Sequence, residues 1–307
     1  MIELVDGYIA IRRAAGYDLK RTEQRLRCFA QFAAGLGDTT IRSETALTWC
    51  SQAGSPHARH LRLRELACLA RHLRAEDPIH ELPPAGLYPS NAKAPVPHLY
   101  SAEDIQRILG AAGRRGPRGS SCGDTYRTLF GLLAVTGLRV GEALRLRLEN
   151  ISEEGLTIRE TKFRKSRLVP LHPTTHQTLR TYRSRWRFLA RLDEPLFISL
   201  RGTAFHYNSV HKVFNDILRT LGLRPPAGSL EIRSKGPRLH DLRHSFAVRA
   251  LEDCPDGRDA VRRHMLALAT YLGHASVRDT YYYLHASPRL MSDIADACES
   301  LDAGGGR

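Results

Sequence analysis

The chain has 307 residues, and its 46 Lys and Arg against 32 Asp and Glu give a formal net charge of +14. This length suits two domains, each large enough for its own apolar core. A balance this basic favours a polyanion such as nucleic acid as the partner. The plain alternative is an arginine-rich protein with no such partner.

The N-terminal part has the pattern of a small helical bundle. Apolar residues recur at helical spacing from Ile2 to about Arg74, with breaks at residues 35–39 and 54–56, which predicts about four helices. Residues 77–97 contain six prolines, which block helices and sheet ladders alike and predict a linker. We therefore expect residues 1–94 to form an N-terminal helical domain that ends in this proline-rich linker.

A second domain is expected from about residue 98 to residue 307. Ser101 is followed three residues later by Asp104, the signature of a helix start. Helical patterns dominate the rest of this domain, except that residues 156–161 and 167–171 alternate around a turn that carries Lys162 and Lys165, as in a β-hairpin. The expected fold is mainly α with a small β-hairpin or sheet.

Other features of the sequence predict a cytoplasmic protein that needs no cofactor. The first residues lack a basic region followed by an apolar stretch, and no apolar segment approaches the roughly 18 residues that span a bilayer. Six cysteines occur without a CxxC pair, which predicts neither a disulfide framework nor a zinc site. A GxxxxGK[ST] phosphate-binding loop is absent as well.

The second domain carries a series of residues suited to phosphate chemistry. In chain order they are Arg139 and Glu142 in Thr-Gly-Leu-Arg-Val-Gly-Glu, Lys162 in the hairpin, His240 and Arg243 in His-Asp-Leu-Arg, His274 in Leu-Gly-His, and Tyr283. Each one alone is explained as well by a solvated helix face, a helix cap or aromatic packing. Their joint occurrence in this order, with a fixed spacing from histidine to tyrosine, favours a shared site.

This ordered set resembles the signature of the tyrosine recombinases, also called the phage integrase family. The resemblance is specific between about Leu129 and Tyr283, and it covers the N-terminal part by layout only. It implies a two-domain DNA clamp, in which a helical core-binding domain joins a mixed α+β catalytic domain. It also implies a site-specific recombinase that acts on double-stranded DNA as four protomers, in integration, excision, transposition or dimer resolution.

The resemblance also assigns a role to each residue of the set. Tyr283 is the nucleophile, Lys162 the hairpin lysine, and Glu142 the acidic residue that supports the first arginine. Arg139 and Arg243 are the two arginines, and His240 and His274 are the two histidines.

The chemistry of the residue types agrees with these roles. Planar guanidinium groups meet two phosphate oxygens at once, and a phenol with a pKa near 10 needs a neighbouring base or cationic field to attack at neutral pH. A lysine at a hairpin tip is suited to give a proton to the leaving 5′ oxygen. Because the guanidinium groups would stabilise the developing charge, no metal is required. Joining DNA to a protein side chain keeps the bond energy, so rejoining needs no ATP.

Several alternatives stay open from the sequence alone. Lys165 competes with Lys162, and Tyr281 and Tyr282 compete with Tyr283. Residues 289–301 have a helical apolar pattern that suits either docking on a neighbouring protomer or folding back on the same domain. Relaxation of supercoils, as by a type IB topoisomerase, and a non-catalytic DNA-binding role beside other recombinases are the two alternative functions.

Overall fold

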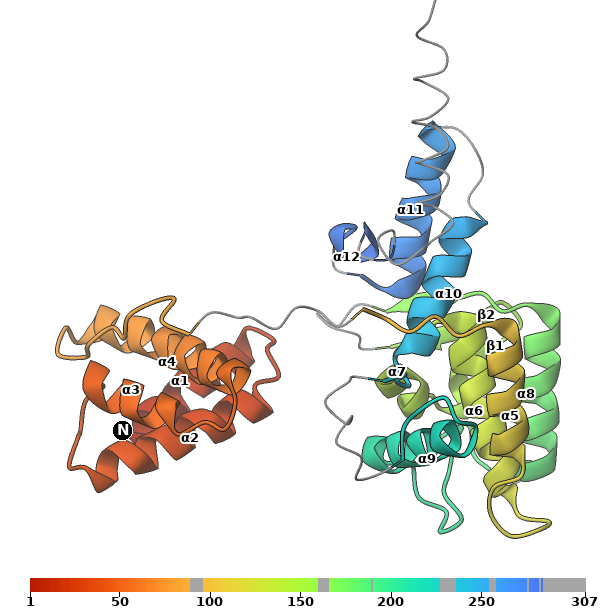
Figure 1. Cartoon of the computed structure of the whole chain (residues 1–307), viewed down its shortest axis with the longest axis horizontal. Helices are drawn as coiled ribbons and strands as arrows, with labels where there is room; N and C mark the ends of the chain where they lie inside the picture. The colour runs from red at the N-terminus through yellow and green to blue at the C-terminus, as the bar shows by residue number, and fades with distance from the viewer. Residues whose placement is uncertain are drawn as a thin grey trace, which may run out of the picture. The chain divides into compact units, whose positions relative to one another are not determined.

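The computed structural model describes residues 1–88, 96–159, 166–188, 190–226, 236–253, 258–274, 276–281 and 283. The chain divides into two compact units, Met1–Pro95 (unit 1) and Val96–Arg307 (unit 2). Figure 1 shows the helices and strands of both units. In the described ranges, no helix is both long and apolar enough to cross a membrane.

Unit 1 is a bundle of four helices, which confirms the helical pattern expected there. The helices are α1 (Ile2–Ala14), α2 (Lys20–Gly35), α3 (Ser43–Ser51) and α4 (Pro56–Glu76). They are the red and orange helices of Figure 1. Their buried side chains form one apolar cluster, in which the rings of Phe29 and Trp49 meet edge to face at 5.4 Å.

Part of the proline-rich stretch is held against unit 1. The ring nitrogen Nδ1 of His80 accepts a hydrogen bond from the backbone N–H of Ile41 at 3.1 Å, and the Glu81 N–H donates to the Ile41 carbonyl at 2.8 Å. At residue 88, the Tyr88 carbonyl oxygen lies 2.7 Å from Nδ1 of His60 on α4. These contacts order residues 80–88 on the bundle despite their prolines.

Unit 2 is mainly helical, with one small sheet. Its elements are α5 (Ala102–Gly113), α6 (Ser121–Thr136), α7 (Val140–Arg145), a 3-10 turn (Leu148–Asn150), β1 (Ile151–Ser152), β2 (Gly155–Ile158), β3 (Arg167–Val169), α8 (Pro173–Trp186), α9 (Tyr207–Thr220), α10 (Asp241–Glu252), α11 (Arg258–Leu272) and α12 (Arg278–Tyr281). Helix α5 begins as expected, because Ser101 and Asp104 form a reciprocal capping box.

The sheet contains the predicted hairpin and one further strand. Strands β2 and β3 pair antiparallel, with Leu156 opposite Val169 and Ile158 opposite Arg167, and β1 adds to the other edge of β2. The third strand has only two residues, too few for an alternating pattern to be visible in the sequence.

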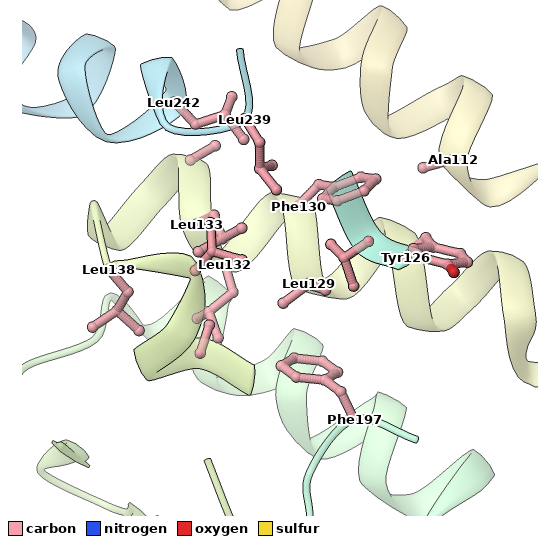
Figure 2. Packing of buried hydrophobic residues seen from close by; sticks show 14 of the residues in the cluster. Ala112, Tyr126, Leu129, Phe130, Leu132, Leu133, Leu138, Phe197, Leu239 and Leu242 are labelled. Atoms are coloured by element: carbon pink, nitrogen blue, oxygen red, sulfur yellow. The ribbon is translucent and has the colours of Figure 1, made fainter. Parts of the chain in front are cut away.

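Helix α6 is the centre of unit 2. It packs against α5, α8 and α10, and most of its apolar side chains are buried. Figure 2 shows Leu129, Phe130 and Leu133 of α6 in one cluster with Leu239, just before α10, and Leu242, in its first turn. This packing brings the start of α10, which carries His-Asp-Leu-Arg, against the helix that leads into Arg139.

Candidate active site

Arg139 and Glu142 form the first part of the site, at the N-terminus of α7. Arg139 is the N-cap residue, and its backbone N–H donates to the Glu142 carboxylate at 3.0 Å. Its guanidinium donates to the same carboxylate at 2.9 Å and to the carbonyl oxygen of Gly273 at 3.0 Å. The Arg139 side chain keeps 37% of its surface exposed, so this side chain is partly accessible to a ligand.

A second arginine, Arg167 on β3, completes the ion-pair cluster around Glu142. Two of its nitrogens donate to the two carboxylate oxygens at 3.2 and 2.8 Å, and its Nε donates to the carbonyl of Tyr271 at 2.8 Å. Burial by itself would raise the pKa of Glu142, but the hydrogen bonds and charges of Arg167 and Arg139 outweigh it and lower that pKa to about 2. Glu142 is therefore a carboxylate throughout the physiological range.

Arg243 lies at the junction of three helices. It is 2% exposed and projects from the first turn of α10. Its guanidinium donates to the carbonyl oxygen of Gly137, just after α6, at 2.7 Å, and to that of Leu272, at the end of α11, at 2.8 Å. These are carbonyls that the two helices leave without partners of their own. Arg243 thus satisfies two helix ends while it points into the site.

His274 is held through a hydrogen bond to Thr280. The Nδ1 atom of the ring lies 2.7 Å from Oγ1 of Thr280, a side chain with 0% exposure. Burial, with the nearby charges of Arg243 and Arg139, lowers the pKa of His274 to about 4. The ring is therefore neutral at pH 7.

Tyr283 is enclosed by the other residues of the site. Its side chain is 4% exposed and shares a side-chain hydrogen bond with Arg243. Its ring stacks at 5.8 Å on His274 and meets His244 edge to face at 5.3 Å. The phenol therefore lies beside the guanidinium of the His-Asp-Leu-Arg motif.

His240 and His244 lie at the start of α10. His240 is the exposed N-cap residue, and its ring meets that of His244 edge to face at 4.9 Å. His244 is 8% exposed, and burial lowers its pKa to about 4. The sequence pattern gave His244 no role of its own, yet it links His240 to Tyr283 through ring contacts.

The structure thus brings five of the predicted residues together: Arg139, Glu142, Arg243, His274 and Tyr283. His240 joins them through the ring of His244. Lys162, its competitor Lys165 and the segment 289–301 lie outside the described residues. Within the ranges that the structure describes, no three His, Cys, Asp or Glu side chains gather as metal ligands would.

Arg167 and Thr280 were missed by the sequence analysis. A signal for Arg167 was present, because side chains of a strand alternate in direction. Arg167 and Val169 are two residues apart on β3, so they share one face of the strand, and Val169 is buried on that face. Leu168, between them, points to the other face and is 42% exposed. Thr280 gave no such signal, since a threonine in a short helix is common.

Comparisons with known proteins identify the family. The profile described as the phage integrase family matches residues 100–289. A Sinorhizobium fredii protein named as an integrase/recombinase, y4rB, is 41% identical over 95% of this chain and 94% of its own length. A second from the same organism, y4rE, is 34% identical over 98% of this chain and 96% of its own length.

The fold agrees with that of solved structures. An integrase of transposon Tn1549, in complex with transposon right end DNA, aligns with a TM-score of 0.67 over 96% of this chain and 98% of that one, at 16% identity. A lambda integrase dimer bound to a core site aligns with a TM-score of 0.63 over 94% and 77%, at 20% identity. The profile match and the full-length relatives show that this chain belongs to the phage integrase family, the tyrosine-type site-specific DNA recombinases.

Proposed function

We propose that this recombinase cleaves one DNA strand by attack of the Tyr283 phenol on a phosphodiester. The hydrogen bond between Tyr283 and the buried guanidinium of Arg243 is the observation that carries this assignment. Because Arg243 contacts the Tyr283 phenol, a phosphate bound to Arg243 would lie next to the nucleophile. Because Tyr283 is 4% exposed in the free chain, DNA binding must also uncover it.

The charge that develops on the phosphate is stabilised by fixed donors. Arg139 and Arg243 already use some of their N–H groups on backbone carbonyls, and the remaining ones serve the non-bridging oxygens. Donors that are held in place before the reaction contribute most to electrostatic stabilisation, and losing one typically costs about a hundredfold or more in rate. His240 and His274 supply further donors in this proposal.

The reaction balances without a cofactor. The Tyr283 oxygen forms a bond to phosphorus and gives its proton to a water molecule, while the bond from phosphorus to the 5′ oxygen breaks. Lys162 gives the leaving 5′ oxygen a proton. The product is a 3′-phosphotyrosyl link and a free 5′ hydroxyl, and attack by another 5′ hydroxyl reverses these steps on a new partner strand.

The two units then act as a clamp on duplex DNA. Unit 1 is the core-binding domain and unit 2 the catalytic domain, in a cytoplasmic protein. Four protomers on two sites exchange strands. In support, solved relatives include a lambda integrase tetramer bound to a Holliday junction and the Tn1549 integrase in complex with a circular intermediate DNA. Mobilisation of a DNA element is the role that these relatives favour.

A nicked half-site substrate that traps the covalent product tests the proposal. The wild-type chain is expected to form an adduct that survives denaturant, and digestion with mass spectrometry should place the DNA on Tyr283. Tyr283→Phe should form no adduct and keep its affinity for DNA. Tyr126→Phe is the matched control, because Tyr126 is also a buried tyrosine, 7% exposed, in the core of unit 2.

Three outcomes would count against the proposed function. Attachment at Tyr281 or Tyr282 would mean that the assumed spacing from His274 to the nucleophile is wrong. The absence of any adduct, on a site that the protein binds, would indicate a non-catalytic partner. Efficient relaxation of a supercoiled plasmid without the site would favour the topoisomerase alternative.

A further inference from the structure

The hydroxyl of Thr280 is completely buried beside the candidate active site. Thr280 has 0% exposure, and its Oγ1 lies 2.7 Å from Nδ1 of His274. Its backbone carbonyl also accepts a hydrogen bond from the N–H of Tyr283 at 3.0 Å. Thr280 therefore connects two residues of the site, one through its side chain and the other through its backbone.

The hydrogen bond has a direction that can be worked out by counting protons. A hydroxyl has one proton to donate, and a neutral imidazole has one N–H and one acceptor nitrogen. Among the residues that the structure describes, Nδ1 of His274 is the one hydrogen-bond partner of Thr280 Oγ1. If Nδ1 carried the proton, the hydroxyl proton would be buried without an acceptor, which costs the full desolvation of that donor.

The favourable arrangement has the hydroxyl as the donor and Nδ1 as the acceptor. The ring proton then lies on Nε2. Within the described part of the chain, Nε2 of His274 makes no hydrogen bond, and it is not among the buried polar atoms without a partner. It is therefore open to a ligand, on a ring that stacks against Tyr283.

We propose that Thr280 is a positioning residue that holds His274 in the tautomer with the proton on Nε2, so that the ring donates a hydrogen bond to a non-bridging oxygen of the scissile phosphate. This inference rests on the proposed function of the site. It adds to the reaction a residue that lies outside the set of motif residues and acts through His274.

The hydrogen bond from Thr280 also explains how the neutral ring of His274 can act as a hydrogen-bond donor beside two arginines. The low pKa of His274 keeps its imidazole ring neutral, with a proton on only one of its two nitrogens. The ring can therefore donate a hydrogen bond to the phosphate only if that proton is on Nε2. In the other tautomer, the lone pair of Nε2 would face the lone pairs of a phosphate oxygen. The Thr280 hydroxyl needs Nδ1 as an acceptor for its proton, so it disfavours the tautomer that carries the ring proton on Nδ1.

Full-length protein with Thr280→Val and Thr280→Ser tests the proposal. Valine keeps the shape without the hydroxyl, and serine keeps the hydroxyl. On the half-site substrate, Thr280→Val should cleave about 10- to 100-fold more slowly, the range that is typical when a metal-binding histidine loses the partner that orients it. Affinity for DNA should not change, and Thr280→Ser should recover most of the rate.

Thr270→Val is the matched control. Thr270 is exposed, and its hydroxyl donates to the carbonyl of Leu266 within α11, so its loss should leave cleavage unchanged. Nitrogen NMR of histidine-labelled protein, with His274 assigned through His274→Gln, reads the tautomer directly. We expect a proton on Nε2 in the wild type and a mixture of tautomers in Thr280→Val.

A proton on Nδ1 in the wild type would overturn the proposal. Equal loss of cleavage in Thr280→Ser and Thr280→Val would overturn it too, because the hydroxyl would then not matter. If the wild type forms no adduct at all, the proposed function fails, while the tautomer measured by NMR still decides whether Thr280 orients His274.

Discussion

Arg167 on strand β3 and Glu142 on helix α7 form a bidentate ion pair, with N–O distances of 3.2 and 2.8 Å. Their side chains are 10% and 3% exposed. Glu142 also binds Arg139, so this pair joins the hairpin to a residue of the candidate site. Removing one partner leaves a buried charge without full compensation.

We expect Arg167→Met to lower the free energy of unfolding of unit 2 by about 3 kcal/mol and to slow cleavage. Arg180→Met is the control, since Arg180 binds Glu153 at 2.6 Å on the surface, with exposures of 56% and 86%, where an ion pair contributes less than about 1 kcal/mol. Urea unfolding in a Trp49→Phe background reports unit 2 alone, because Trp186 is then the only tryptophan. Similar losses for both variants would contradict the prediction.

Gly137→Ala should destabilise unit 2 more than Gly202→Ala. Both glycines have positive φ angles, 60° and 76°, so alanine is strained at either position by roughly 1–2 kcal/mol. A Cβ atom at Gly137 would also lie 2.5 Å from Cδ1 of Phe246, whereas one at Gly202 meets no atom within 4 Å. Because the Gly137 carbonyl binds Arg243, cleavage should fall as well. Equal urea midpoints would refute this.

Unit 2 should lose stability as the pH falls from about 6.5 to about 4. In the folded state, His244 and His274 have pKa values of about 4, against an ordinary value of 6.5. The unfolded chain therefore binds more protons in this window, and the free energy of unfolding decreases with falling pH. From pH 6.5 to 5, His244 alone accounts for about 2 kcal/mol.

Urea unfolding at pH 7.5, 6 and 5 and constant ionic strength measures this effect. His244→Gln should reduce the pH dependence, and His57→Gln, at an exposed position of unit 1, should not. Below pH 4.5 the carboxylate of Glu142, with a pKa of about 2 in the folded state, causes a further decrease in the free energy of unfolding as the pH falls. A stability of unit 2 that does not vary between pH 7.5 and 5 would contradict the assignment of neutral, buried histidines.

Binding to the DNA site should weaken steeply with salt. A net charge of +14 supports many contacts to phosphates, and each contact releases counterions. For six to ten such contacts, affinity falls by a factor of about 10³ to 10⁵ between 50 and 200 mM salt. Titrations at four salt concentrations give the slope, and a slope near zero would be incompatible with a phosphate clamp.

Local patterns made much of this structure predictable from the sequence. The capping box at Ser101 depends on residues three apart, and the hairpin on residues within one stretch of chain. Arg139 and Glu142 are likewise close neighbours in sequence. In each case the interacting residues are near neighbours in the sequence, so their pattern can be recognised without knowledge of the tertiary structure.

The contacts that position the site are of another kind. Arg243 reaches Gly137 across 106 residues and Leu272 across 29, and Arg167 reaches Tyr271 across 104. Their acceptors are backbone carbonyls, which every residue type has, so no particular residue type marks them. Only the packing of α6, α10 and α11 determines which carbonyls these are.

The position of Arg243 at two helix ends has an evolutionary consequence. A copy of this gene that no longer needed to cut DNA would lose little folding free energy if its nucleophile became phenylalanine, whereas replacing Arg243 would leave two buried carbonyls unpaired. Decaying copies should therefore keep the arginine long after the tyrosine has changed. An intact arginine alone is thus a poor marker of an active enzyme.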